Sequence, residues 1–133
     1  MRVVHYSIQG NHLHLIVEID DPSMLPRAIQ GFAVRLAKTL NRLAARSGKV
    51  FLDRYHAHVL RTRREVRNAV WYVLENFRHH LREDIAPTGA DPCSSAAWLG
   101  PRFTDDVPIA LPRTWLLRSS ETCIIQTDDT LAM

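Results

Sequence analysis

The chain has 133 residues, of which 46% are hydrophobic and 23% are charged, and its formal net charge is +3. This length and composition fit one globular domain with its own core and exclude a chain that is disordered throughout. The two cysteines lack zinc-finger spacing, and no apolar run reaches the roughly 18 residues that span a bilayer, so we expect a cytoplasmic protein without a disulfide framework or a membrane partner.

The charge is unevenly distributed along the chain. Residues 1–84 contain 14 Lys and Arg against 8 Asp and Glu, whereas residues 85–133 contain 3 against 6. A basic first part suggests a polyanionic partner, although arginine on a solvated helix face is also common. We therefore divide the chain into a basic domain, 1–84, and an acidic, proline-rich tail, 85–133.

Two alternating runs at the start of the chain predict a β-hairpin. Arg2–Gln9 and His12–Ile19 are separated by Gly10-Asn11, a dipeptide suited to a two-residue turn. Counting outward from the turn pairs Gln9 with His12, Ser7 with His14, His5 with Ile16, Ile8 with Leu13, Tyr6 with Leu15 and Val4 with Val17. One face of this hairpin is apolar, and the other is polar around two imidazoles.

The pair His12 and His14 raises a functional question. Side chains alternate across a strand, so the two imidazoles share one face, as the ligands of a metal ion would. A half-exposed strand also tolerates histidine without any function. The pair alone does not choose between these interpretations.

A long amphipathic helix is predicted next, from Met24 to about Ala45, with Ser23 as its N-cap. Its apolar stripe consists of Leu25, Ile29, Phe32, Ala33, Leu36, Leu40 and Leu43. Basic side chains recur at helical spacing and form one ridge: Arg35, Lys38, Arg42 and Arg46. Such a ridge contacts either phosphates or only solvent.

Residues 49–61, "KVFLDRYHAHVLR", are rich in aromatic and branched side chains and predict another strand. This segment contains a second His-x-His pair, His56 and His58. Together with His12 and His14 they can form an all-histidine zinc site or simply a polar face.

A second helix is predicted from a cap at Thr62 to about Asp84. Its buried stripe consists of Val66, Ala69, Val70, Val73, Leu74 and Phe77, and we place Trp71 in the core as well. Tyr72 and Asn76 lie four residues apart and therefore project from the same helix face. A tyrosine packed at the edge of the core is the simpler explanation of this pattern.

The tail after Asp84 lacks periodicity, so we expect little regular structure there and disorder at its end. Within it, "PRTWLL" offers Trp115 and two leucines for docking on the body of the domain.

The order of these features resembles the single-tyrosine HUH transposases, in particular the REP-associated tyrosine transposases. The resemblance covers residues 2–117 and rests on His-Leu-His, "FLDRYHAHVLR", "NAVWYVLENFRHH", "DPCSSAAW" and "PRTWLL". It implies that His12, His14 and Asn76 bind Mg²⁺ or Mn²⁺ and that Tyr72 is the catalytic nucleophile. These side chains must then meet on one side of the sheet.

The resemblance also implies an α+β, ferredoxin-like HUH fold, with a mostly antiparallel sheet and two main helices. The family normally has another strand and helix before the segment that matches Val3–Gln9. We therefore expect a domain that lacks its first strand and helix, so that residues 1–84 form an N-terminally incomplete catalytic domain.

The implied function is metal-dependent nicking and strand transfer of single-stranded or hairpin DNA through a 5′-phosphotyrosine intermediate, by a monomer or homodimer. The alternatives are a catalytically inactive DNA-binding remnant and the all-histidine zinc protein. The expected DNA contacts are Arg35, Lys38, Arg42, Arg46, Arg61, Arg63, Arg64 and Arg67, with His56 and His58 in supporting roles.

Overall fold

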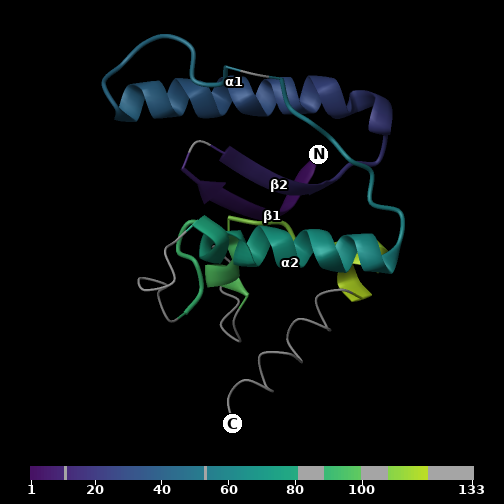
Figure 1. The fold of residues 1–133 in the computed structure, drawn as a ribbon. Coiled ribbons are helices and arrows are strands. Elements are labelled where there is room, and N and C mark those ends of the chain that lie inside the picture. The colour runs from purple at the N-terminus through teal and green to yellow at the C-terminus, as the bar shows by residue number, and fades with distance from the viewer. Residues whose placement is uncertain (11, 53, 81–88, 100–107, 120–133) are drawn as a thin grey trace. The chain divides into compact units, whose positions relative to one another are not determined.

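The structure, a computed structural model, describes residues 1–10, 12–52, 54–80, 89–99 and 108–119, with only the backbone described for 76–80. The elements are β1 (Arg2–Gln9), β2 (His12–Glu18), η1 (Pro22–Met24), α1 (Leu25–Leu43), α2 (Arg63–His80) and η2 (Ser95–Trp98) (Figure 1). The fold is α+β, and the described residues contain one antiparallel sheet, formed by β1 and β2. No helix in these described ranges is long and apolar enough to cross a membrane.

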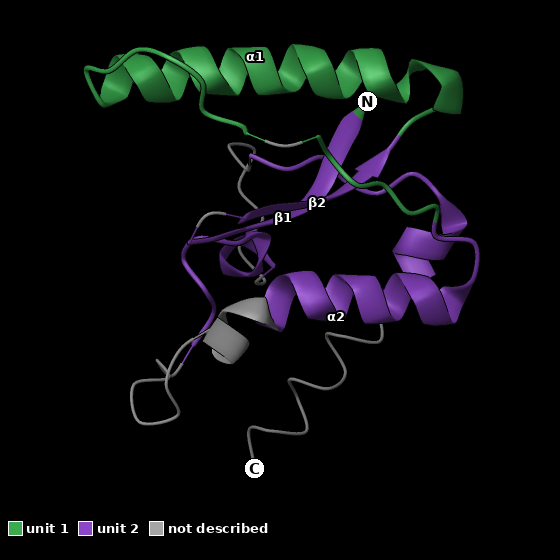
Figure 2. Cartoon of the chain, turned by 45° about the horizontal axis from the view of Figure 1, so that its top comes forward, with its two compact units in different colours: residues 1, 19–59 green, residues 2–18, 60–133 purple. Residues whose placement is uncertain are grey.

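The chain forms two compact units (Figure 2). One comprises residue 1 and residues 19–59, and the other comprises residues 2–18 and 60–133. The first unit contains α1, and the second contains the hairpin and α2. The hairpin and the second predicted helix, which carry the candidate catalytic residues, therefore belong to the same unit.

The hairpin register is confirmed from the turn to His5. Gln9 pairs with His12, Ser7 with His14 and His5 with Ile16, and Gly10 adopts the positive φ of 53° that the tight turn requires. The predicted pairing of Val4 with Val17 is wrong, because the register shifts between Val3 and His5 and Val3 pairs with Val17. Such a bulge breaks the strict alternation of side chains, and consecutive residues Val4 and His5 are both fully buried.

The second unit is stabilised by α2, which begins with the predicted cap at Thr62. The Thr62 hydroxyl accepts a hydrogen bond from the Glu65 N–H at 3.2 Å, and the Glu65 carboxylate accepts one from the Thr62 N–H at 3.1 Å. This reciprocal capping box satisfies N–H groups that have no partner within the helix.

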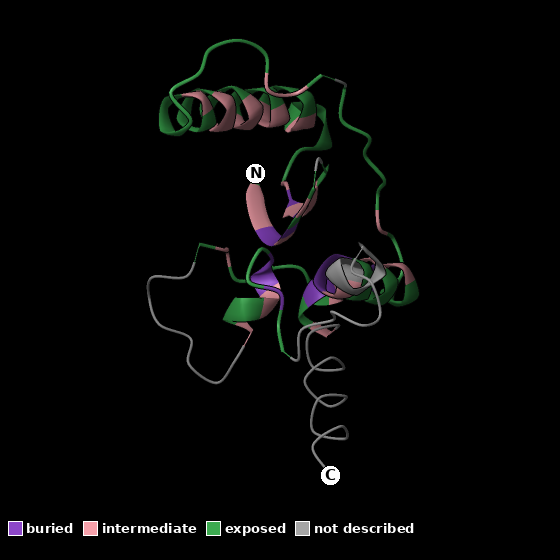
Figure 3. Cartoon of the chain, turned by 60° about the vertical axis from the view of Figure 1, so that its left-hand side comes forward, coloured by how far each residue is buried: buried purple, intermediate pink, exposed green. Residues whose placement is uncertain are grey.

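The core of this unit lies between α2 and the strands, where Figure 3 shows the buried residues. It consists of Val4, Ile16, Val66, Val70, Val73, Leu74 and Leu117. Four of the predicted stripe residues of α2 are among them, and Ala69 packs against them half-buried. The predicted helix end near Asp84 and the side chain of Phe77 lie outside what the structure describes.

Residues 89–99 and 108–119 pack along the hairpin. The Ile8 N–H donates to the Cys93 carbonyl at 2.9 Å, and Ser7 forms an antiparallel bridge with Ser94. The Ala110 N–H donates to the Val3 carbonyl at 2.8 Å. These bonds extend the outer edge of β1, which would otherwise expose unpaired backbone groups. The predicted boundary at residue 84 and the end of the tail lie outside the described residues.

The docking of "PRTWLL" follows a different pattern from the one expected. Leu117 is buried in the core and Leu116 packs against it, as predicted for the leucines. Trp115, however, is exposed. Since 115–119 form a short helical turn, successive side chains point in different directions, and one turn cannot bury all three.

In the first unit, the cap of the helical segment is Asp21 and not Ser23. The Asp21 carboxylate accepts the Ser23 N–H at 2.9 Å, and a 3₁₀ turn precedes α1. The helix ends two residues earlier than predicted, and Ala45 follows with a φ of 48°. No residue of α1, all of which the structure describes, is buried, so its apolar stripe is at most half-buried.

The predicted strand over 49–61 is wrong. The described residues of this segment, which leave out Asp53, have no strand, and Leu52, Tyr55 and Val59 are exposed. Branched and aromatic residues favour a strand only when another strand pairs with it. In the described part of the chain, β1 and β2 pair with each other and with no strand from this segment.

Candidate active site

The two histidines of β2 lie side by side on the face of the hairpin that the register predicts. His12 is exposed and His14 is half-buried, and their ring centroids are 6.2 Å apart with the planes tilted by 37°. The residues paired with them on β1, Gln9 and Ser7, are half-buried and buried. This polar face is therefore partly covered and not simply solvated.

Tyr72 approaches the same face from α2. Its ring meets the His14 ring edge-on, with the centroids 5.4 Å apart and the planes at 86°. The rotation of α2 accounts for this position, because Val70, Val73 and Leu74 are buried and Tyr72 lies at the edge of that stripe. Tyr72 is 46% exposed, so its side chain is accessible from solvent.

Asn76 lies one helical turn after Tyr72 on α2, and its side chain is outside the described part of the structure. The four-residue spacing directs both side chains from the same face of the helix. The structure therefore brings together His12, His14 and Tyr72, and the role of Asn76 stays a prediction.

Asp91 is a buried carboxylate that was not among the predicted site residues, and it binds Gln9, the residue paired with His12. The Gln9 side-chain amide donates to Asp91 Oδ2 at 2.6 Å and to Ser7 Oγ at 3.0 Å. Asp91 is buried, and its other oxygen accepts the Cys93 N–H at 2.8 Å. An aspartate that accepts the N–H two residues later is typical of an Asx turn, and Asp-Pro-Cys is compatible with one. No pattern in the sequence predicts its long-range bond to Gln9.

A second buried contact joins His5 to the segment after α2. The Nδ1 atom of His5 lies 3.2 Å from Ser95 Oγ, and the same hydroxyl accepts the Tyr6 N–H at 3.2 Å. Ser95 is fully buried, and it begins η2, whose N-cap is Ser94. The chain around Ser95 therefore packs against the same strand that pairs with the candidate ligand residues.

The predicted ligands His12, His14 and Asn76 are of kinds that bind divalent cations. Two adjacent imidazoles and one amide oxygen would leave coordination positions for water and for a phosphate oxygen, as Mn²⁺ or Mg²⁺ requires. In the residues that the structure describes, no three His, Cys, Asp or Glu side chains are grouped to hold a metal ion, and this search does not include asparagine. His56 and His58 are both exposed and belong to the other unit.

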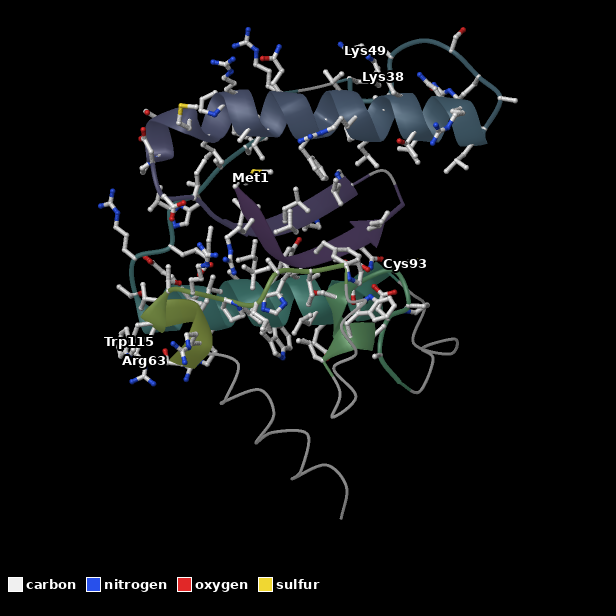
Figure 4. All side chains as sticks on the ribbon, turned by 180° about the vertical axis from the view of Figure 1, so that it is seen from behind. Met1, Lys38, Lys49, Arg63, Cys93 and Trp115 are labelled. Atoms are coloured by element: carbon white, nitrogen blue, oxygen red, sulfur yellow. The ribbon has the colours of Figure 1, made fainter. Side chains whose placement is uncertain are left out.

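The predicted basic residues occupy exposed positions in both units. In the first unit these are Arg35, Lys38 and Arg42 on α1 and Arg46 just after it, with Lys38 labelled in Figure 4. In the second unit they are Arg61, two residues before α2, and Arg63, Arg64 and Arg67 in the first turns of α2. The prediction that Trp71 is in the core is wrong, because this side chain projects from the exposed face of α2.

No protein-family model, curated protein or solved structure matches this chain. The geometry of the site and the chemistry of its residues therefore carry the functional inference.

Proposed function

We propose that this chain is a metal-dependent endonuclease and strand transferase acting on single-stranded DNA, of the single-tyrosine HUH type that includes the REP-associated tyrosine transposases. The observation that carries the proposal is the edge-on contact of Tyr72 with His14, at 5.4 Å between ring centroids. In this proposal Tyr72 is the nucleophile, and the imidazole beside it belongs to the pair that binds the metal ion. The α+β fold and its antiparallel hairpin are compatible with a ferredoxin-like HUH domain.

Tyrosine is a suitable nucleophile for a DNA phosphodiester. Its phenol has an ordinary pKa near 10, far below that of an alkyl alcohol. It is therefore deprotonated more easily for attack, and the phenolate is a better leaving group than an alkoxide. The Tyr72 oxygen attacks phosphorus and the bond to the 3′ oxygen breaks. The phenol loses a proton and the departing 3′ oxygen gains one. The product is a 5′-phosphotyrosine, which a 3′-hydroxyl can later attack to rejoin the strands.

The residues that would hold Mg²⁺ or Mn²⁺ are His12, His14 and Asn76. When bound, the cation supplies charge neutralisation at a non-bridging phosphate oxygen. The protein positions the nucleophile relative to the cation. Tyr72 and Asn76 extend from one rigid helix, so the nucleophile and the third ligand move together, and the packing of α2 on the hairpin sets their distance from the histidines.

Exposed arginines would bind the phosphates of the strand, with a single-stranded or hairpin DNA as the substrate. Arg64 lies on the same helix row as Tyr72, at two four-residue steps toward the N-terminus of α2. A separate basic ridge lies on α1, in the other unit. We place this activity in the cytoplasm, in a monomer or homodimer.

The test is a covalent adduct. The protein is incubated with a fluorescent single-stranded oligonucleotide carrying a short hairpin, in Mn²⁺ or Mg²⁺, and run on a denaturing gel. We expect a protein-linked band that disappears in Tyr72→Phe, in His14→Ala and in excess chelator. The matched control is Tyr55→Phe, because Tyr55 is also 46% exposed but lies in the other unit.

A band that persists in Tyr72→Phe would disprove the assignment of the nucleophile. Salt-sensitive binding without any adduct in the unmodified protein would instead favour the inactive DNA-binding remnant. Because the chain has only three tyrosines, mass spectrometry of the digested adduct identifies the linked residue directly.

A further inference from the structure

Two arginines on the exposed side of α2 lie between two tryptophans, one from α2 and one from the helical turn 115–119. We name this set the Arg–Trp row: Trp115, Arg63, Arg67 and Trp71. Arg63, Arg67 and Trp71 follow one another at four-residue steps and therefore lie along one face of the helix. At the N-terminal end of the row, the Arg63 guanidinium lies over the Trp115 ring, 5.3 Å from its centroid. Figure 4 shows these two side chains together at one end of α2.

Both tryptophans are exposed, and neither belongs to the core. Trp115 is 66% exposed even with Arg63 against it, and Trp71 is 54% exposed. Burying a large aromatic ring is among the most favourable contributions to folding, so two exposed rings on one surface are unusual for a region without a ligand.

The position of Trp115 is fixed by its neighbours. The Glu18 carboxylate accepts the N–H groups of Arg113 and Thr114, at 3.0 and 2.8 Å, and Leu117 is buried in the core. The indole therefore projects from a backbone that is anchored on both sides. Anchoring lowers the conformational entropy lost on binding, as expected for a preformed contact surface.

The charge of the row favours a polyanion. Glu65 is the single acidic residue in the first two turns of α2, and its carboxylate is engaged by the N–H groups of Arg61 and Thr62. The first two turns of α2 therefore carry three arginines, Arg63, Arg64 and Arg67, against one carboxylate. Arginines next to exposed aromatic rings are typical of single-strand binding, where guanidinium groups contact phosphates and bases stack on the rings.

We propose that the Arg–Trp row is a binding surface for single-stranded DNA, with bases stacked on Trp71 and Trp115 and phosphates held by Arg63 and Arg67. Arg63 and Trp71 are eight residues apart, or about 12 Å along the helix, which is long enough for a few nucleotides. The choice of DNA as ligand rests on the function proposed above.

The test measures binding without chemistry. The full chain is titrated with a short oligothymidylate in excess chelator, and the affinity is obtained from fluorescence anisotropy and from quenching of tryptophan emission. We expect Trp115→Ala and Trp71→Ala each to weaken binding roughly five-fold or more, the lower end of a stacking contact. Trp115→Phe keeps a stacking ring and should stay within about two-fold of the unmodified protein.

The matched control is Trp98→Phe, which changes the third tryptophan, located on η2 and bonded to the Tyr6 hydroxyl. This variant should bind like the unmodified protein and keep the quenching from the other two rings. Arg67→Ala should reduce the slope of log affinity against log salt by about 0.7, the value for one phosphate contact on a single strand. Thermal unfolding of each variant shows whether it is folded. If Trp115→Ala does not fold, the affinities of Trp71→Ala and Arg67→Ala decide whether the row binds the strand.

The proposal is overturned if both tryptophan-to-alanine variants bind like the unmodified protein, or if a duplex of the same length binds as tightly as the single strand. Binding that depends on Trp115 without any covalent adduct would support the Arg–Trp row as a binding surface and contradict the proposed nuclease activity. An adduct that forms with unchanged affinity in both tryptophan variants would support the proposed nuclease activity and contradict the Arg–Trp row as a binding surface.

Discussion

The Glu18 carboxylate is the anchor of the segment that follows α2, and its removal gives a quantitative test of the fold. Glu18 is buried and accepts four hydrogen bonds, from the N–H of Arg113 to both oxygens and from the N–H and hydroxyl of Thr114, at 2.7 to 3.1 Å. Arg2 Nε lies 3.7 Å from the same carboxylate. Glu18→Gln keeps the shape of the side chain but replaces one acceptor oxygen by an NH₂ donor.

The expected loss follows from these contacts. In Glu18→Gln, the oxygen at the Oε1 position still accepts from Thr114 and, at 3.1 Å, from the Arg113 N–H. The new NH₂ group replaces the Oε2 acceptor and faces two donors, the Arg113 N–H and Arg2 Nε. Losing one charge-assisted hydrogen bond in a buried place costs about 2 kcal/mol in the free energy of unfolding at pH 7. In a chain of this size, that corresponds to a melting temperature lower by about 6 to 10 °C.

The pH dependence provides a second measurement. Burial alone raises the pKa of Glu18. This effect is outweighed by hydrogen bonds from the N–H groups of Thr114 and Arg113 and from the Thr114 hydroxyl, and by the charge of Arg2, so that the pKa lies below its ordinary 4.5. A carboxyl with a depressed pKa in the folded protein stabilises fully above the unfolded value and loses that contribution as pH falls through the folded value. The difference between the unmodified protein and Glu18→Gln should therefore be constant near neutral pH and shrink below pH 4.5.

The assay is chemical or thermal unfolding followed by circular dichroism between pH 3 and 8. Asp20→Asn is the matched control, since it also removes one carboxylate, but from an exposed residue just beyond β2. Equal stability of Glu18→Gln and the unmodified protein at pH 7 would refute the reasoning. So would a difference that grows as the pH falls below 4.5.

Two further substitutions test contacts that shape the site. Thr62→Ala removes the acceptor of the Glu65 N–H and should lower the free energy of unfolding by about 1 kcal/mol, with Thr62→Ser retaining most of it. Denaturant midpoints that do not differ between these two variants would contradict the capping role. Asp91→Asn replaces the charged acceptor of the Gln9 amide and should cost about 1 to 3 kcal/mol by the same measurement. An unchanged midpoint would mean that this bond does not stabilise the hairpin.

Local patterns were enough to predict the hairpin and the start of α2. Alternation and a Gly-Asn turn determine which residues face each other, and five pairs from Gln9–His12 to His5–Ile16 agree with the structure. Thr62 and Glu65 have the spacing of a capping box. The bulge at Val4 has no such signal, because it depends on how β1 packs against α2 and the later chain.

Features that depend on distant partners were not predictable. The strand over 49–61 was inferred from residue preferences alone, which do not supply a pairing strand. Conversely, the chain after residue 88 has no periodicity, yet Asp91, Ser94 and Ser95 are buried against the hairpin. Short polar residues that bond to a strand edge leave no repeat for pattern reading to detect. The exposure of Trp71 and Trp115 was missed because hydrophobic character alone suggests a core residue.

The proposed chemistry depends on the register of the hairpin as much as on its residue types. A shift of one residue would turn both imidazoles to the opposite face, away from Tyr72. A two-stranded hairpin is marginal by itself and needs contacts outside the pair of strands to stabilise one register. Here α2 packs on the hairpin, the Ser7–Ser94 bridge adds a partner to β1, and Asp91 holds the Gln9 amide opposite His12. Residues far along the chain thus stabilise the register in which the tyrosine and the histidines meet.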